Sequence, residues 1–204
     1  GQIFKAKKTD DLQLAESKKN LGEIKGNKLT LEPVPGKNEE YRVLAEGNAF
    51  FRYSDFTIKA QTGRWNRAEN SVIFEKNVRF ESEDYILLGE KLEGNMKDEK
   101  FNVRGNVKFK GDDLLLTAKN LEYNHLQKKA VLKTDASLDY KNISAVSDKI
   151  IYNRAEKMVY LVGNVSGTQK DAEFSAGKIN VNLETEKIEL SEKAKLVFPD
   201  RGDN

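Results

Sequence analysis

The sequence predicts an all-β protein in which antiparallel strands follow one another in tandem 29-residue repeats. Segments that begin at Asn48, Asn77, Asn106, Asp135 and Asn164 recur at a constant spacing of 29 residues. Within each repeat, apolar residues occupy every second position, which is the period of a β-strand. No segment shows the sustained 3.6-residue stripe of an amphipathic helix. A constant phase without insertions is typical of a stacked array.

The alternation predicts two long strands in each repeat. In the repeat that begins at Asn106, the apolar phase slips by one residue between Ala118 and Leu121. Such a slip turns side chains to the opposite face, so we expect a β-bulge or a sharp bend there. From Phe101 to Phe109 the apolar residues keep a single phase, which predicts one strand of about nine residues, roughly 30 Å long. Only the first strand of each repeat is therefore expected to bend.

A conserved position within the repeat marks one of the two turns. The nineteenth residue of every repeat is asparagine, and charged residues follow it. Asparagine tolerates the left-handed conformation and closes side-chain-to-backbone turns, so we expect these residues to start hairpins rather than to bind a ligand. They are Asn66, Asn95, Asn124, Asn153 and Asn182.

The two ends of the chain depart from the repeat. Residues 1–28 are predicted to be a flexible N-terminal arm, 29–198 the repeat domain, and 199–204 a disordered tail. Pro33 and Pro35 belong at an edge or in a loop, because proline cannot donate to a ladder. The chain begins with Gly1 rather than Met, which suggests a preceding leader or membrane anchor.

Composition excludes several classes of function. Lys and Arg number 35 against 33 Asp and Glu, and both signs are interspersed. A nucleic-acid-binding protein would need clustered positive charge, so we predict no nucleic-acid partner. The chain has no cysteine, which excludes disulfides and thiolate metal sites. No apolar run approaches the ~18–20 residues of a membrane span.

No residue cluster predicts catalysis. The single histidine, His125, follows Asn124 in a polar turn, and we interpret it as a surface residue. The acidic residues fall mainly in turns, such as Asp112 and Asp113, where solvent exposure is their simplest explanation. There is no nucleophile elbow and no phosphate-binding glycine loop. We therefore predict no catalytic residue, no metal and no cofactor.

The in-phase apolar residues can form either a filled core or a groove between two β-layers. Several inward positions carry small residues, among them Gly63, Gly89, Gly94 and Ala118, which would leave room between the layers. The pattern alone leaves both alternatives open.

Three segments resemble a known repeat. Gly105–Phe109, Leu116–Asn124 and Val159–Val165 read GNVKF, LTAKNLEYN and VYLVGNV. They are similar to the OstA-like repeat of the bacterial lipopolysaccharide-transport family, which comprises LptA, LptC and the N-terminal domain of LptD. The resemblance is closest to the LptA type and extends from Tyr41 to Phe198, about three-quarters of the chain.

The resemblance implies an open, bent β-jellyroll of antiparallel strands that carries lipopolysaccharide acyl chains in an apolar groove. It also implies a periplasmic location, possible tethering to the inner membrane, and edge-strand pairing with other jellyroll-bearing transport components. We expect head-to-tail homo-oligomers. An alternative is a surface β-solenoid acting as an adhesin or scaffold without lipid. The expected groove residues are Phe51, Phe56, Ile58, Trp65, Phe74, Phe80, Leu87, Phe101, Val103, Phe109, Leu116, Tyr123, Leu132, Leu138, Tyr152 and Leu161.

Overall fold

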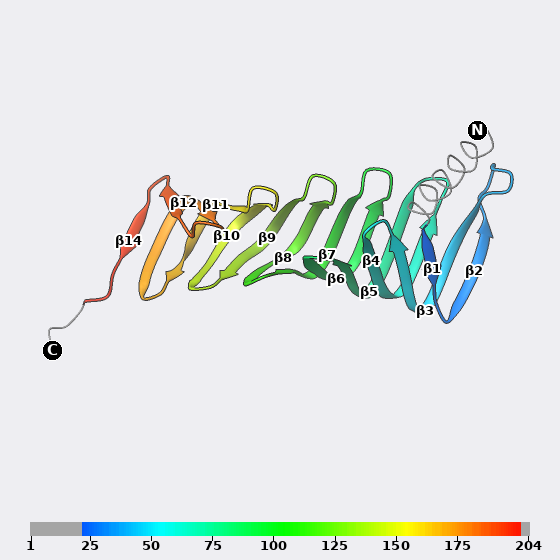
Figure 1. Ribbon diagram of the computed structural model, residues 1–204, viewed down its shortest axis with the longest axis horizontal. Helices are drawn as coiled ribbons and strands as arrows, with labels where there is room; N and C mark the ends of the chain where they lie inside the picture. Colours follow the sequence, from blue (N-terminus) through cyan, green and yellow to red (C-terminus); the bar gives the residue numbers. More distant parts are fainter. Residues whose placement is uncertain (1–21, 201–204) are drawn as a thin grey trace, which may run out of the picture.

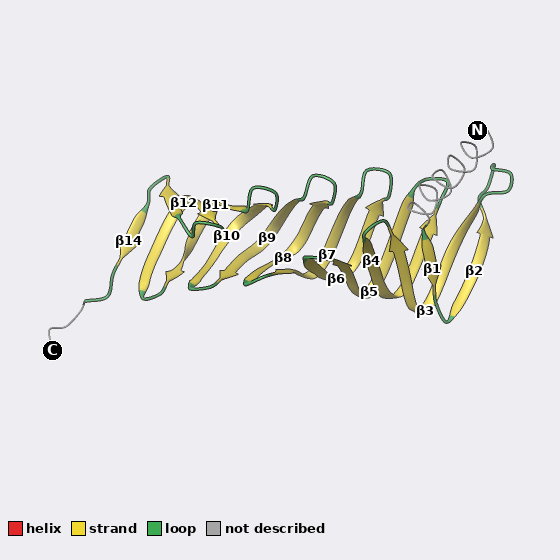
Figure 2. Cartoon of the chain, in the orientation of Figure 1, coloured by secondary structure: helices red, strands yellow, loops and turns green. Residues whose placement is uncertain are grey.

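The computed structural model describes residues 22–200, and these residues form one open antiparallel sheet of 14 strands. The strands succeed one another along the long axis, from β2 at one end to β14 at the other (Figure 1). Strands and their connections account for all the described residues, and no helix among them could span a membrane (Figure 2). The all-β prediction and the open, bent jellyroll are confirmed.

Ten long strands make up the body of the sheet, and two short strands lie at each end. The short strands are β1 (Glu23–Lys25), β2 (Lys28–Pro33), β13 (Ile188–Ser191) and β14 (Lys195–Val197). The long strands are β3 (Tyr41–Tyr53), β4 (Phe56–Asn66), β5 (Ser71–Ser82), β6 (Tyr85–Asn95), β7 (Lys100–Gly111), β8 (Leu114–Asn124), β9 (Lys129–Tyr140), β10 (Ile143–Asn153), β11 (Met158–Gln169) and β12 (Ala172–Asn182).

The N-terminal boundary differs from the prediction. We expected an arm over residues 1–28, but β1 lies within that range and β2 begins at its last residue. Both strands pair with β3, β2 along its first half and β1 along its second. The rest of the expected arm, residues 1–21, lies outside the described residues, as do residues 201–204 of the expected tail.

Two kinds of turn alternate along the chain. Two-residue hairpins occur at 54–55, 83–84, 112–113, 141–142 and 170–171, and longer loops at 67–70, 96–99, 125–128, 154–157 and 183–187. Each repeat therefore supplies two strands, as predicted.

The repeated asparagines start the longer loops. The side-chain oxygen of Asn124 accepts a hydrogen bond from the backbone N–H of Gln127 at 2.9 Å, and Asn182 accepts two such bonds. Asn66, Asn95 and Asn153 do the same. The predicted turn-forming role is confirmed at all five positions.

Both strands of each repeat bend, although only one bend was predicted. The expected bulge in β8 is present, because its pairing with β9 shifts register between Thr117 and Asn120. In β7, however, Gly105 and Asn106 have φ of +78° and +47°, in the left-handed region, and the register shifts there too. The extra residue in β7 preserves the odd-even phase, so apolar periodicity could not show this bend.

The bends fold the sheet onto itself into two layers. Phe56 of β4 and Phe101 of β7 lie three strands apart in the sheet, a separation of about 14 Å if it were flat. Their ring centroids are nevertheless 5.4 Å apart. We call the strand halves next to the two-residue hairpins the hairpin layer and the halves next to the longer loops the loop layer. The line opposite the bends, where hairpins meet loops, is the seam.

Candidate functional site

The sixteen residues predicted to line a groove all face the space between the two layers. Fourteen of them are at most 2% exposed, and Trp65 and Tyr152 are partly buried against the same cluster. The hairpin layer contributes Phe51, Phe56, Ile58, Phe80, Leu87, Phe109, Leu116 and Leu138, and the loop layer contributes the other eight. The structure brings the whole predicted set together, while its binding of lipid stays a prediction.

Aromatic rings form a continuous network through the first half of this interior. The network runs from Trp65, whose ring centroid lies 5.2 Å from that of Phe51, to Tyr152, 5.4 Å from Phe109. Phe80 lies near its centre, stacked on Phe56 at 4.7 Å and edge-on to Phe101 at 5.0 Å. Beyond Tyr152 the interior is mainly aliphatic, with residues such as Ile150, Leu161 and Ile179.

Small residues do not leave room between the layers, contrary to our expectation. A methyl group added at Gly63 would collide with the ring of Phe74 on the neighbouring strand, and one at Gly94 with the ring of Phe101. At Gly89 it would meet the side chain of Val103. Each glycine therefore makes space for a large side chain on the next strand. The interior described here is a filled core.

A cavity of about 670 Å³ lies where the N-terminal end of the interior reaches the surface. Trp65, Tyr53, Val43 and Met96 are among the residues that line it. The guanidinium of Arg67 lies 5.5 Å from the Trp65 ring centroid at its edge. The cavity therefore gives solvent access to one end of the aromatic network.

Polar contacts close the seam at intervals. Asp55 belongs to a two-residue hairpin and His125 to a longer loop 70 residues away. The Oδ1 atom of Asp55 lies 2.8 Å from Nε2 of His125, and the hydroxyl of Tyr85 lies 2.6 Å from Nδ1. With a proton assigned to Nε2, His125 donates to Asp55 and accepts from Tyr85, so both nitrogens are satisfied.

A second contact repeats this arrangement one repeat further along the chain. Arg154 donates from Nη2 to Asp84 at 3.2 Å and from Nη1 to the hydroxyl of Tyr123 at 3.2 Å. Its guanidinium also lies 4.2 Å from the ring centroid of Tyr85, a distance suited to a cation–π contact. Asp84 and Arg154 are again 70 residues apart, so both contacts use the same offset between the rows.

A third contact closes the seam nearer the C-terminus. Lys141, in a two-residue hairpin, pairs with Glu186 in the last of the longer loops. Beside it, the hydroxyl of Tyr140 donates to the backbone oxygen of Leu183 at 2.8 Å. The seam is thus held by side chains, whereas the opposite side of the fold consists of continuous strands.

Burial and charge shift the pKa values of the seam residues. Burial raises the pKa of Tyr85 and of Tyr123, so both phenols stay neutral. Partial burial acts to raise the pKa of Asp55, but the hydrogen bond from His125 outweighs it and the pKa lies below its ordinary value. Burial raises the pKa of Glu99, whose carboxylate lies 3.9 Å from His125.

The comparisons with known proteins identify the family. Residues 57–187, more than half of the chain, match the family described as LptA/(LptD N-terminal domain) LPS transport protein. The chain belongs to this family. A solved structure of LptH, the LptA-homologous periplasmic component of the lipopolysaccharide transport device of Pseudomonas aeruginosa, is similar at 11% identity and a TM-score of 0.34. That similarity covers 71% of this chain and 95% of LptH. No curated protein matches.

Sequence analysis misjudged one residue of this family member. We interpreted His125 as a surface residue, but its side chain is only 9% exposed and lies across the seam. Its partners Asp55 and Tyr85 are 70 and 40 residues away, so no local spacing could have pointed to the contact. A signal was present only in the repeat itself, because the same offset of 70 residues joins Arg154 to Asp84.

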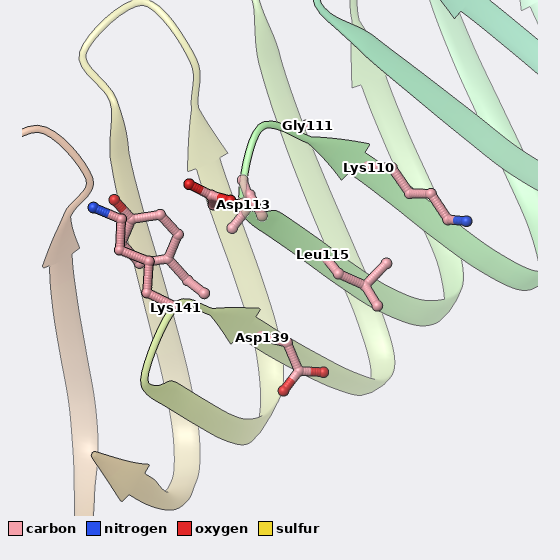
Figure 3. A pocket seen from close by; sticks show the side chains of 8 residues that line it. Lys110, Gly111, Asp113, Leu115, Asp139 and Lys141 are labelled. Atoms are coloured by element: carbon pink, nitrogen blue, oxygen red, sulfur yellow. The ribbon is translucent and has the colours of Figure 1, made fainter. Parts of the chain in front are cut away.

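Two other features were considered as sites. A cavity of about 340 Å³ lies beside neighbouring hairpins, with Gly111 and Asp113 on one and Lys141 on the other (Figure 3). Lys110 points away from it, while Leu115 and Asp139 lie on the adjoining strands (Figure 3). Among residues 22–200, no three side chains of His, Asp or Glu come together as a metal site.

Proposed function

We propose that this protein binds lipopolysaccharide in the periplasm and carries it between the inner and outer membranes as a non-enzymatic transport component. Its acyl chains would lie between the hairpin layer and the loop layer. The observation that carries this proposal is the continuous apolar interior, to which both layers contribute along the length of the sheet. Membership of the lipopolysaccharide-transport family supports it.

The filled interior must open for an acyl chain to bind. The backbone ladder joins neighbouring strands within a layer, so the layers can part about the line of bends without breaking it. Burial of an acyl chain contributes about 0.8 kcal/mol per CH₂, or about 9 kcal/mol for a twelve-carbon chain. That gain can offset the separation of facing side chains, because the chain replaces the contacts they lose.

Photo-crosslinking tests the location of the lipid. Trp65 and Tyr152 are large and only partly buried, so p-benzoylphenylalanine fits at either position without a buried charge or a void. We expect both variants to crosslink to purified lipopolysaccharide. A variant at Lys108, an exposed outer-face residue of β7, is the matched control and should not. Equal labelling at all three positions, or none at the first two, would refute the interior site.

The two ends of the sheet support edge-to-edge assembly. In the described residues, β1 and β2 cover β3, and β13 and β14 cover β12, while their own outer edges are unpaired. Unpaired strand edges readily add another chain. Apolar side chains are exposed at both ends, including Leu31 at 60% and Phe198 at 68%. We expect head-to-tail homo-oligomers and pairing with other jellyroll-bearing components.

Light scattering across a wide concentration range tests this assembly. The mass should rise with concentration, and Leu31→Lys and Phe198→Lys should lower it without loss of folding. A constant monomer mass would contradict the prediction.

A scaffold function without lipid is the second candidate. The observation that favours it is the closed packing of the interior, with fourteen of the predicted groove residues almost inaccessible to solvent. Absence of crosslinking at Trp65 and Tyr152, with the protein folded, would support this candidate instead.

A further inference from the structure

The seam is the part of the molecule where a bound amphiphile can connect its two halves. An acyl chain can enter the apolar interior, whereas a charged sugar head group cannot do so without a large desolvation penalty. A lipid held between the layers must therefore pass through the boundary of the sandwich. On the side of the bends, that boundary is a hydrogen-bonded sheet without a gap. At the seam only side chains meet.

The contacts across the seam are arranged as separate pairs. Asp55 and Asp84 come from consecutive two-residue hairpins, and His125 and Arg154 come from consecutive longer loops. Each pair joins a nearly buried basic side chain to a carboxylate that is mostly exposed, 66% for Asp55 and 74% for Asp84. The pairs therefore recur once per repeat along the seam, and solvent reaches each of them.

The geometry points to the seam as a slit that the lipid crosses sideways, with the His125–Asp55 and Arg154–Asp84 pairs as clasps that must open for loading. This inference rests on the proposed lipid-carrying function. The acyl chains move in between the layers while the head group stays outside, and each clasp closes behind them. The cavity next to the clasps is lined by Asp55, Glu83, Asp84 and Glu99 against Lys128 and Arg154. This excess of carboxylates keeps an anionic head group from lodging at the clasp.

A reversible covalent bridge across the seam tests the inference. The chain has no cysteine, so Asp55→Cys with His125→Cys creates a unique pair for a short bis-maleimide. Loading is measured as lipopolysaccharide crosslinking to p-benzoylphenylalanine at position 152. We expect loading to be lost in the bridged protein. The same variant capped with N-ethylmaleimide should load at least as fast as the parent.

A bridge within one layer is the matched control. Lys133 Nζ lies 2.7 Å from Glu122 Oε1 on the adjacent strands β9 and β8, and both side chains are exposed. Glu122→Cys with Lys133→Cys, bridged by the same reagent, should load normally. If the Asp55 and His125 variant does not fold by circular dichroism, the exposed Lys141 and Glu186 pair replaces it across the seam.

The outcomes separate this inference from the proposed function. Equal loading of the bridged and capped proteins would overturn the lateral route and leave lipid binding intact, with access through the ends. Loss of loading in the control bridged within one layer would also overturn it. Absence of loading in the parent would overturn the proposed function and the lateral route together.

Discussion

Truncation of Phe80 is expected to weaken the free protein and strengthen its response to lipid. Phe80 is fully buried at the centre of the aromatic network, stacked on Phe56 at 4.7 Å and in edge contact with Phe101 at 5.0 Å. Phe→Ala substitutions in cores remove about 3–5 kcal/mol of stability, because the lost contacts leave a cavity. In a domain of this size, each 1 kcal/mol lowers Tm by about 2–4 °C.

The cavity left by Phe80→Ala lies between the two layers, where we place the acyl chains. A lipid that fills it restores contacts that the wild-type protein already has. Ligand stabilisation grows with affinity for the folded state, about 2.7 kcal/mol at a hundred times Kd. We therefore expect lipopolysaccharide to raise Tm more in Phe80→Ala than in wild type. Differential scanning fluorimetry with and without purified lipopolysaccharide measures both shifts.

Tyr160→Ala is the control, since it truncates a partly exposed ring on the outer face of β11, beside Lys178. It should change Tm little and leave the lipid-induced shift as in wild type. A lipid-induced shift that is equal or smaller in Phe80→Ala than in wild type would refute the placement of acyl chains next to Phe80.

Three further substitutions have defined outcomes. Asn124→Ala removes the acceptor for the backbone N–H of Gln127, so urea titration should show a loss of about 1 kcal/mol. Gly94→Val places methyl groups against Phe101, and overpacking of this kind should reduce stability by about 1–3 kcal/mol. Burial raises the pKa of Glu99, so the folded state disfavours its charge above the ordinary pKa. Glu99→Gln should therefore raise Tm at pH 7.5, and the gain should disappear below about pH 4, where the carboxyl is protonated in both states.

Most of the fold followed from two regularities of the sequence. The repeat of 29 residues predicted the number and order of long strands, and the alternation assigned the interior face. The phase slip after Ala118 correctly placed one bend, because a slipped phase has a single structural solution. The second bend, at Gly105 and Asn106, was invisible because it adds a residue while keeping the parity.

The interior and the seam show where sequence reasoning reaches its limit. Alternation identifies which residues face inward, but it does not tell whether their volumes fill the space. Gly63 and Gly94 suggested room, yet each lies under an aromatic ring of the adjacent strand. The seam contacts join residues 70 positions apart, and they depend on how the two layers are offset once the sheet has folded. That offset is a property of the twist and the bends together, which no single repeat encodes.

The fold is held together unequally in its different directions, and this inequality bears on transport. Within a layer, each strand is joined to its neighbours by backbone hydrogen bonds. Across the seam, the clasps pair exposed carboxylates with His125 and Arg154, and ion pairs of such exposure contribute about 0–1 kcal/mol each. The apolar contacts between layers are larger, but an acyl chain replaces them in kind. Separation along the seam is therefore the deformation that a lipid can compensate, while separation of strands within a layer is one that it cannot.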